Sequence, residues 1–363
     1  MTTAMTTSGP GPEVLTVGRV GVDLYPDVEH RPEVMGVPLE QVTGFARSLG
    51  GTATNVAVAA ARLGRRAAVL TKVGPDPFGD YVRMALRGFG VDPAYVGTEP
   101  GLLTPVVFCA LDPPEDPPLL FYRLPVAPDL TLTDDDVPWD VVASVPLFWV
   151  TGTGVSREPA RSTQLAMLEH RGRPPTGAGT DSGDPDGARR WTVLDLDWRP
   201  MFWSGPADAR REYDRMLDHV NVAVGNRAEV EVATGTSDPQ EAAQRLLDRG
   251  VELAIVKRGG AGVLVARRGP DGGMVTDTVA PQRIQVVCGL GAGDAFGGAL
   301  VHGLLSGWDP VACARYANAA GAIVASRLAC ADAMPTGAEL EQALSPTPGV
   351  EQTGVPETGG VRA

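Results

Sequence analysis

The residues with the most evident chemistry form the segment 289–294, Gly-Leu-Gly-Ala-Gly-Asp, which leads into the apolar run 295–300. This pattern predicts a turn without side chains at the start of a helix, where backbone N–H groups lack internal partners and carry partial positive charge. Glycines let an anion approach those groups closely. Asp294 adds one carboxylate at the same junction. Amides that hold developing negative charge, beside a carboxylate that accepts a hydroxyl proton, suit phosphoryl transfer.

A second glycine cluster precedes another expected helix. Gly50 and Gly51 let the backbone reach a ligand, and the side chain of Asn55 offers both a donor and an acceptor. Taken alone, this segment is better explained as a tight turn with Asn55 as the helix cap. Asp23 follows the first apolar run, at the position where an open parallel sheet binds ligands. Its carboxylate can accept two hydroxyl hydrogen bonds, but an exposed turn aspartate explains the position about as well.

Two further segments are suited to a nucleotide and its metal ion. Asn226 and Glu229 stand three residues apart, on one face of an expected helix, where they can hold water around Mg²⁺. Taken alone, a helix N-cap with Glu at the third position is the simpler explanation. Lys257, Gly259 and Gly262 belong to a glycine-rich turn between two strand-like runs. That turn predicts a β-hairpin, and a hairpin without any ligand is its default interpretation.

Two arginines suggest a negatively charged substrate. Arg123 lies in the segment Phe-Tyr-Arg, and Arg199 follows a buried strand in the segment Asp-Leu-Asp-Trp-Arg. The guanidinium fork matches a carboxylate in shape and charge. If both side chains enter one cleft, the substrate carries a negative group besides any phosphate. For either arginine alone, an ordinary surface ion pair is the better explanation.

The rest of the chain alternates between apolar runs and helical segments. Strands are expected at 14–20, 67–73, 147–151, 191–196, 220–224 and 253–257. Helices are expected at 55–63, with a glycine stop at Gly64, and at 161–171, 207–218, 239–249 and 292–305. Such alternation, with nearly continuous apolar strands, predicts a parallel sheet covered by helices on both faces.

Two segments interrupt this rhythm and predict a small β lid. Residues 22–48 are extended and polar, and residues 104–126 hold two strand-like runs around a turn. Such insertions often cover the strand ends, where ligands bind. The chain is otherwise expected to form one domain over 13–340, with a surface insertion at 172–189. The Gly-, Pro- and Thr-rich ends, 1–12 and 341–363, are expected to be flexible tails.

Composition excludes several classes of protein. The chain has 363 residues and a formal net charge of -13, which argues against a nucleic-acid or anionic-membrane partner. Four histidines are scattered along it, which argues against a histidine-rich metal site. The four cysteines include no C-x-x-C pair and predict buried free thiols in a reducing cytoplasm. No signal-peptide pattern or membrane span is expected.

Taken together and in order, these motifs resemble the ribokinase (PfkB) family of carbohydrate kinases over nearly all of residues 13–336. Four motifs in the right order are far more specific than any one of them. The resemblance implies a ribokinase-like three-layer α/β/α sandwich with a mostly parallel central sheet and a small β lid. It also implies an ATP- and Mg²⁺-dependent phosphotransferase that acts on an alcohol group of a small sugar.

The resemblance implies a role for each motif residue. Asp294 would be the general base, and the amides of Gly291, Ala292 and Gly293 would form the anion hole. The sugar would be held by Asp23, Gly50, Gly51 and Asn55. Mg²⁺–ATP would be organised by Asn226 and by Glu229, the latter through water. The nucleotide would be bordered by Lys257, Gly259, Gly262 and Asn318.

Within the family, several segments of this chain are similar to the 5-dehydro-2-deoxygluconokinases of inositol catabolism. The substrate of those enzymes is a sugar acid, which would explain the presence of Arg123 and Arg199. Related 2-keto-3-deoxygluconate kinases have Asn where this chain has Asp197. The family usually has Asp or Asn where this chain has Cys288, a position that helps many members to bind a monovalent cation. A thiol is a poor ligand for K⁺, whereas backbone carbonyls can still serve, so K⁺ dependence stays open.

The favoured function is therefore a sugar-acid kinase. A 2-keto-3-deoxygluconate kinase or a fructokinase-type enzyme is the alternative within the family. A sensor that binds sugar or nucleotide without catalysis is the alternative from another class, since a fold alone does not fix function. Asp294 argues against a sensor, which does not need a base. A Rossmann dehydrogenase is a poor match because no G-x-G-x-x-G follows the first strand. A homodimer through the lid is also expected, because exposed edge strands can pair between subunits.

Overall fold

The computed structural model describes residues 10–31, 35–173 and 189–345. Most of the expected insertion, 172–189, and most of both expected tails, 1–12 and 341–363, lie outside these residues. Helix α10 (Gly337–Leu344) extends four residues into the segment expected as a tail. A capping box starts it, in which Thr336 and Glu339 satisfy each other's backbone N–H groups. In the described part of the chain, no helix is long and apolar enough to cross a membrane.

A ten-stranded sheet runs through the molecule in the order β14-β13-β12-β11-β10-β9-β1-β4-β5, and β6 also pairs with β4. The pairs from β12 through β11, β10, β9 and β1 to β4, β5 and β6 are parallel, while β12–β13 and β13–β14 are antiparallel. The strand bounds are β1 Val14–Val17, β4 Ala67–Val73, β5 Val91–Asp92, β6 Val96–Thr98, β9 Leu147–Thr151, β10 Trp191–Asp195, β11 Val222–Asn226, β12 Leu253–Lys257, β13 Val263–Arg268 and β14 Met274–Val279. The six strands expected from sequence are all present.

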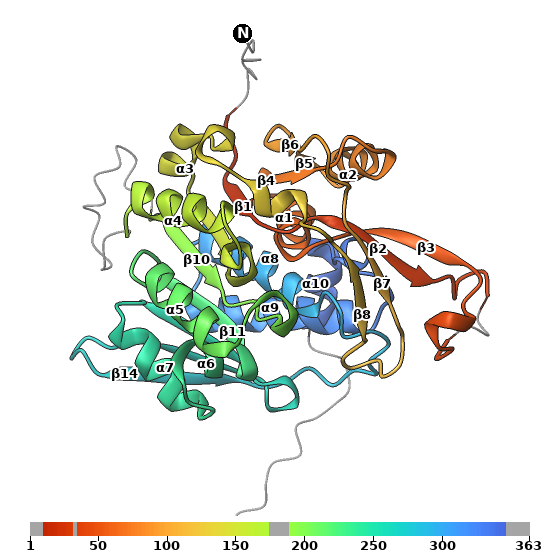
Figure 1. Cartoon of the computed structure of the whole chain (residues 1–363). Coiled ribbons are helices and arrows are strands. Elements are labelled where there is room, and N and C mark those ends of the chain that lie inside the picture. Colours follow the sequence, from red (N-terminus) through yellow and green to blue (C-terminus); the bar gives the residue numbers. More distant parts are fainter. Residues whose placement is uncertain (1–9, 32–34, 174–188, 346–363) are drawn as a thin grey trace, which may run out of the picture.

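Helices cover both faces of this sheet, so the predicted three-layer α/β/α sandwich is confirmed (Figure 1). One face packs on α1 Thr52–Arg62, α2 Pro77–Gly88, α8 Ala292–Leu305, α9 Pro310–Ala325 and α10. The other packs on α3 Trp139–Ser144, α4 Ala160–Arg171, α5 Pro206–Leu217, α6 Arg227–Thr234 and α7 Pro239–Asp248. Alternate residues of β9 belong to opposite cores, and all five are buried. Burial on both faces explains why these strands are apolar throughout.

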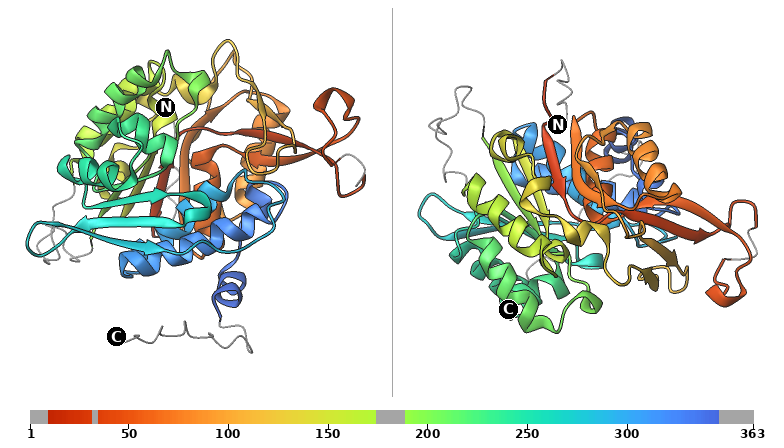
Figure 2. Two further views of the ribbon diagram at one scale, coloured as in Figure 1. Left: turned by 90° about the horizontal axis from the view of Figure 1, so that it is seen from below. Right: turned by 45° about the horizontal axis from the view of Figure 1, so that its top comes forward.

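The predicted β lid is a separate four-stranded sheet with the order β3-β2-β7-β8. Its strands are β2 Gly21–Pro26, β3 Phe45–Gly50, β7 Val106–Cys109 and β8 Leu119–Tyr122. They come from the two segments that break the helix–strand rhythm of the sequence. Figure 2 shows the lid strands projecting beyond the body of the sandwich. A small apolar cluster that includes Tyr25, Cys109, Cys288 and Cys330 lies at the base of the lid.

The fold brings the expected motifs to one edge of the central sheet. Parallel strands all end at the same edge, and the segments after β1, β10, β11 and β12 begin there. Helix α1 begins after Gly51, whose φ of 103° suits glycine. Its expected glycine stop is confirmed, because Gly64 follows the helix with a φ of 84°. The candidate site is therefore assembled from segments that are distant in sequence.

Candidate active site

A pocket lies between this edge of the sheet and the lid. Eleven of the sixteen residues predicted for the site line it: Asp23, Gly51, Asn55, Arg123, Arg199, Asn226, Glu229, Lys257, Gly291, Gly293 and Asp294. These residues come from both sheets and from the starts of three helices. The fold thus brings these residues together in one pocket, as the sequence predicted.

The other five predicted residues lie beside the pocket or away from it. Gly50 does not line it, but a Cβ at that position would collide with the carboxylate of Asp23. Ala292 donates its N–H to the carbonyl of Gly289 at 3.4 Å. Gly259 and Gly262 lie in the β12–β13 hairpin, which the sequence predicted. Asn318 donates its side-chain amide to the carbonyl of Ala280 at 3.0 Å, outside the pocket lining.

Asp294 lies in the first turn of helix α8, directly after the turn of the glycine-rich segment. Gly291 is the N-cap, with a left-handed φ of 82°. The carboxylate of Asp294 accepts a hydrogen bond from the side-chain amide of Asn55 at 2.7 Å. Burial raises the pKa of Asp294 to about 6, although the bond from Asn55 acts to lower it. A carboxyl group with this pKa is ionised at neutral pH and basic enough to accept a hydroxyl proton.

Asp23 lies on lid strand β2 and faces the same pocket. Burial raises the pKa of Asp23 to about 7, against the opposing attraction of Arg19. Close by, the hydroxyl of Tyr25 lies 3.0 Å from the Sγ of Cys330. The Oδ1 of Asn55 is buried and has no hydrogen-bond partner among the described residues. A carboxylate and an open amide oxygen in one pocket can hold neighbouring hydroxyl groups.

Three neighbouring strands, β10, β11 and β12, place polar residues at their carboxyl ends. Asp195 ends β10, while Asn226 and Lys257 end β11 and β12 and are paired in register. Asn226 and Glu229 form a capping box at the start of α6, so the simpler helix-cap interpretation is confirmed. Glu229 still lines the pocket. Carboxylate and amide oxygens at this end are ligands suited to Mg²⁺, directly or through water.

The lid touches the segment that precedes the anion hole. The turn between β7 and β8 accepts a backbone hydrogen bond at Pro114 from the N–H of Gly289, at 2.7 Å. Glu115, Asp116 and Pro117 of the same turn line the pocket. This contact joins the lid to the segment that leads into helix α8.

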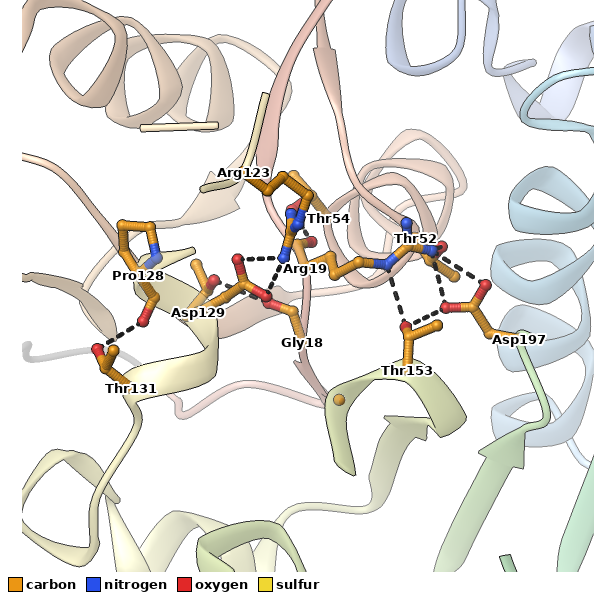
Figure 3. Close-up of polar contacts among 12 residues, drawn as sticks. Gly18, Arg19, Thr52, Thr54, Arg123, Pro128, Asp129, Thr131, Thr153 and Asp197 are labelled. Carbon is orange, nitrogen blue, oxygen red and sulfur yellow. Dashed lines mark hydrogen bonds and ion pairs between the residues drawn. The ribbon is translucent and has the colours of Figure 1, made fainter. Parts of the chain in front are cut away.

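The sequence interpretation did not single out Arg19, which is central to one end of the pocket. It is buried, and its Nε donates to the hydroxyl of Thr153 at 3.0 Å. Its Nη2 donates to both carboxylate oxygens of Asp197, at 2.8 and 3.0 Å, and to the hydroxyl of Thr52 (Figure 3). Burial acts to raise the pKa of Asp197, but Arg19 and Arg199 outweigh it and hold that pKa below its usual value.

Arg123 is paired within the same region. Its Nη2 donates to both oxygens of the buried Asp129, at 2.9 and 2.8 Å (Figure 3). The guanidinium groups of Arg19 and Arg123 lie 5.7 and 5.4 Å from the centre of the Phe202 ring. The Nε of Arg199 lies 3.5 Å from Asp197. We call one end of the pocket the arginine end; it consists of Arg19, Arg123 and Arg199 with Asp129 and Asp197. We call the other end the transfer end; it consists of Asp195, Glu229, Lys257, Gly293 and Asp294.

Comparisons with known proteins agree with this geometry. The profile of pfkB family carbohydrate kinases matches residues 12–173 and 187–337. The chain belongs to this family. A 5-dehydro-2-deoxygluconokinase of Photobacterium profundum is 31% identical over 331 residues, which cover 89% of this chain and 92% of the relative. One from Geobacillus thermodenitrificans is 29% identical over 338 residues, which cover 91% of this chain and 92% of the relative.

A solved pfkB-type structure supports the same fold. The fructokinase double mutant of Vibrio cholerae, in its fructose-, ADP- and potassium-bound form, has a TM-score of 0.75 and 26% sequence identity. The match covers 92% of this chain and 98% of the fructokinase. The ribokinase-like fold and the carbohydrate-kinase class predicted from the motifs are therefore confirmed.

In this pfkB kinase, Arg19 and Asp195 are site residues that a rule based on sequence could have identified. Each follows or ends a buried parallel strand at its carboxyl end, the rule that pointed to Asp23. Asp197 also lies in this region and has a φ of 27°, which is uncommon for a residue other than glycine. Cys288 is buried beside the lid in the cluster with Cys109 and Cys330.

Proposed function

We propose that this kinase transfers the γ-phosphoryl group of ATP to a hydroxyl group of a sugar acid. The acid is 5-dehydro-2-deoxygluconate, which belongs to myo-inositol catabolism. The observation that carries the proposal is the arginine end of the pocket. The curated relatives named 5-dehydro-2-deoxygluconokinase support the same choice.

The charges at the arginine end favour an anionic substrate. Three arginines there pair with two aspartates, so Arg19 and Arg199 share Asp197 while Arg123 has Asp129 to itself. The terminal nitrogens of Arg199 have no hydrogen-bond partner among the described residues, its side chain is 35% exposed, and it lines the pocket. The guanidinium of Arg199 therefore has charged donors free for a substrate carboxylate. A neutral sugar would offer those donors no charged acceptor.

Asp294 takes the proton of the attacking hydroxyl as the new oxygen–phosphorus bond forms. Asn55 fixes the orientation of this carboxylate through its 2.7 Å hydrogen bond. Asp23 and the free Oδ1 of Asn55 hold other hydroxyl groups of the sugar. The amide of Gly293 and its neighbours at the start of α8 stabilise the oxygens of the transferring group. One well-placed donor of this kind is commonly worth about 3–4 kcal/mol.

The transfer end fits a magnesium–nucleotide complex. Asp195 lines the pocket without a hydrogen-bond partner among the described residues, and burial raises its pKa well above the usual value. A nearby cation would relieve that cost. Glu229 and Asn226 would hold the water shell of Mg²⁺, which would neutralise phosphate charge when bound. The Vibrio cholerae fructokinase has been solved in potassium-bound and calcium-bound forms. K⁺ activation here would use backbone carbonyls near Cys288.

The deciding experiment measures ATP consumption with a panel of acceptors. The panel contains 5-dehydro-2-deoxygluconate, 2-keto-3-deoxygluconate, fructose and ribose, and the Asp294→Asn variant is the control for background hydrolysis. We expect the largest kcat/KM with 5-dehydro-2-deoxygluconate. A preference for 2-keto-3-deoxygluconate or fructose would replace this substrate with one of the two family alternatives. Binding of sugars without turnover on any acceptor would favour the sensor.

We also propose that two copies pair through the lid. The face of the lid turned away from the pocket carries partly exposed Phe45, Phe108 and Tyr122, whose rings contact one another at centroid distances of 5.2 and 5.5 Å. Light scattering of the wild type and of Tyr122→Asp would test this. The variant should be monomeric if the lid is the interface. The four cysteines are free and buried, which suits the reducing cytoplasm in which we place the enzyme.

A further inference from the structure

Lys257 is one of two lysines in the chain, against 29 arginines. The other, Lys72, is a structural residue: its Nζ lies 2.7 Å from Asp136 and 3.1 Å from Glu99. Both side chains are largely buried, but their surroundings differ. Lys257 ends strand β12 and lines the pocket, whereas Lys72 lies on β4 outside it. The pocket therefore contains an ammonium group, although nearly all basic residues of the chain are arginines.

The ammonium group of Lys257 lies against the anion hole. Its Nζ is 3.2 Å from the point that a Cβ on Gly293 would occupy, and apart from the neighbouring residues and backbone of helix α8 no other described atom lies within 4 Å of that point. Gly293 is the second residue of helix α8, so its N–H has no partner inside the helix. The absence of a side chain at Gly293 therefore lets a charged donor and a backbone donor face the same small volume.

Lys257 has no hydrogen bond or ion pair with any residue in the described part of the chain. Burial acts to lower the pKa of Lys257, but the surrounding carboxylates Glu229, Asp195 and Asp294 outweigh it and raise that pKa. The side chain is therefore charged at neutral pH. These carboxylates compensate the charge of the ammonium group but make no hydrogen bond or ion pair with it, so its three N–H donors are free of partners among the described residues. Free charged donors in a pocket are suited to a ligand with negative oxygens.

We propose that Lys257 is a catalytic residue, whose ammonium group binds an oxygen of the transferring phosphoryl group together with the amide of Gly293. This inference rests on the kinase reaction above but not on the identity of the sugar. The bond between the γ-phosphorus and the β,γ-bridging oxygen breaks, and the bond to the acceptor oxygen forms. The acceptor proton goes to Asp294, and the electron pair of the broken bond stays on ADP. Lys257 keeps its proton throughout.

The physical basis is the charge distribution of phosphoryl transfer. Charge is spread over the equatorial oxygens of the transferring group, so catalysis depends mainly on positioned positive charge. A fixed ammonium in a pocket largely lined by protein acts more strongly than it would in solution. This role differs from bordering the nucleotide, because a ground-state contact would lower KM for ATP without raising kcat.

The kinetic test compares Lys257→Met with the matched variant Lys72→Met. We expect Lys257→Met to lower kcat by about 10²–10³-fold, the range seen when one such donor is removed, with KM for ATP within about threefold. Lys72→Met should lower the melting temperature and leave kcat unchanged. A rise in KM for ATP with an unchanged kcat would overturn the proposal and make Lys257 a ground-state nucleotide contact.

A second measurement is made on the wild-type protein, and a variant serves only to assign its signals. Selective ¹⁵N labelling of lysine side chains gives two Nζ signals in the wild type, which Lys72→Met assigns. Adding Mg²⁺, ADP and aluminium fluoride with the acceptor sugar mimics the transferring group. We expect the Lys257 signal to shift and the Lys72 signal to stay; no shift at Lys257 would overturn the proposal. If the sugar acid is not the acceptor, the same comparison is made with whichever sugar the panel identifies.

Discussion

Among the described residues, charged side chains are paired with one another at the arginine end of the pocket, whereas at the transfer end Lys257 and Asp195 are not. At the arginine end, Arg19 and Arg123 are already bound by Asp197 and Asp129 at 2.8–3.0 Å. At the transfer end, Lys257 and Asp195 have no such partner in the parts of the chain that are described. The pKa of Asp195 is raised, whereas that of Asp197, only two residues away, is lowered.

This difference indicates that the arginine end recognises the substrate and that the transfer end carries out the phosphoryl transfer. Paired side chains hold one orientation before the substrate arrives, so little ordering cost remains to be met on binding. The free donors of Lys257 and the carboxyl group of Asp195, whose pKa is raised by burial, remain available for a phosphate and a metal ion. The arginine end is therefore built for selectivity, and the transfer end is built to interact most strongly with charge that develops during the reaction.

The largest expected effect lies at the transfer end. Asp294→Asn removes the base but keeps the shape and the contact with Asn55, so kcat should fall by about 10²–10⁴-fold. The affinity for ATP, measured by calorimetry, should change little. Turnover close to that of the wild type would show that another group accepts the proton and would remove the main distinction between the two ends.

The next effect concerns the arginine end. Arg199→Ala should reduce kcat/KM for sugar acids by about 10–100-fold, the loss expected for a hydrogen bond to a charged group. Activity on neutral sugars should fall much less. Arg123→Ala should show the same selectivity but also unfold more easily, because it leaves the buried Asp129 without its partner.

A double variant separates these two effects of Arg123. Replacing both Arg123 and Asp129 by leucine should restore the free energy of unfolding. It should not restore the preference for sugar acids over neutral sugars. Equal losses on acids and neutral sugars in all three variants would contradict a carboxylate role for this end.

A smaller effect should appear in the pH dependence. Because the pKa of Asp294 is raised to about 6, kcat should fall about tenfold per pH unit below that value and be level above it. A profile that is flat between pH 5 and 8 would contradict the base assignment. The comparison variant is Thr153→Val at the arginine end, which should keep the shape of the wild-type profile.

The same raised pKa values affect stability. Burial raises the pKa of Asp23 to about 7 and that of Asp294 to about 6 in the folded chain, above the usual aspartate value of 3.8. Their favourable contribution is therefore complete below pH 4 and is lost as the pH rises to about 7. Asp23→Asn should gain stability relative to the wild type across this interval, as measured by urea unfolding without ligands.

The smallest expected effect is at Thr153, which accepts from Arg19 and donates to Asp197. Thr153→Val leaves both charged partners with one fewer hydrogen bond and should cost about 1–3 kcal/mol of unfolding free energy. Thr153→Ser keeps the hydroxyl and should cost less. If the two variants are equally stable, the arginine end does not depend on this bond for its fixed arrangement.

Much of the molecule follows from local sequence patterns. Apolar runs bounded by polar residues and glycines placed the six expected strands of the central sheet, and β4, β9 and β12 match their expected bounds. Asp294 was identifiable because a glycine turn before an apolar helix leaves free amides beside it. These features depend on residues a few positions apart, so physical rules that apply to short segments are sufficient.

Only the tertiary structure decided which charges meet. Arg19 and Asp197 are 178 positions apart, and their contact depends on how β1 and β10 flank β9 in the sheet. The resemblance placed Lys257 and Gly293 in one site, but only the strand order decided that the Lys257 ammonium lies against Gly293, since a hairpin end and a helix start are distant in sequence. Local patterns determine elements and turn chemistry, whereas burial and pairing of charges arise from long-range packing, which no short segment encodes.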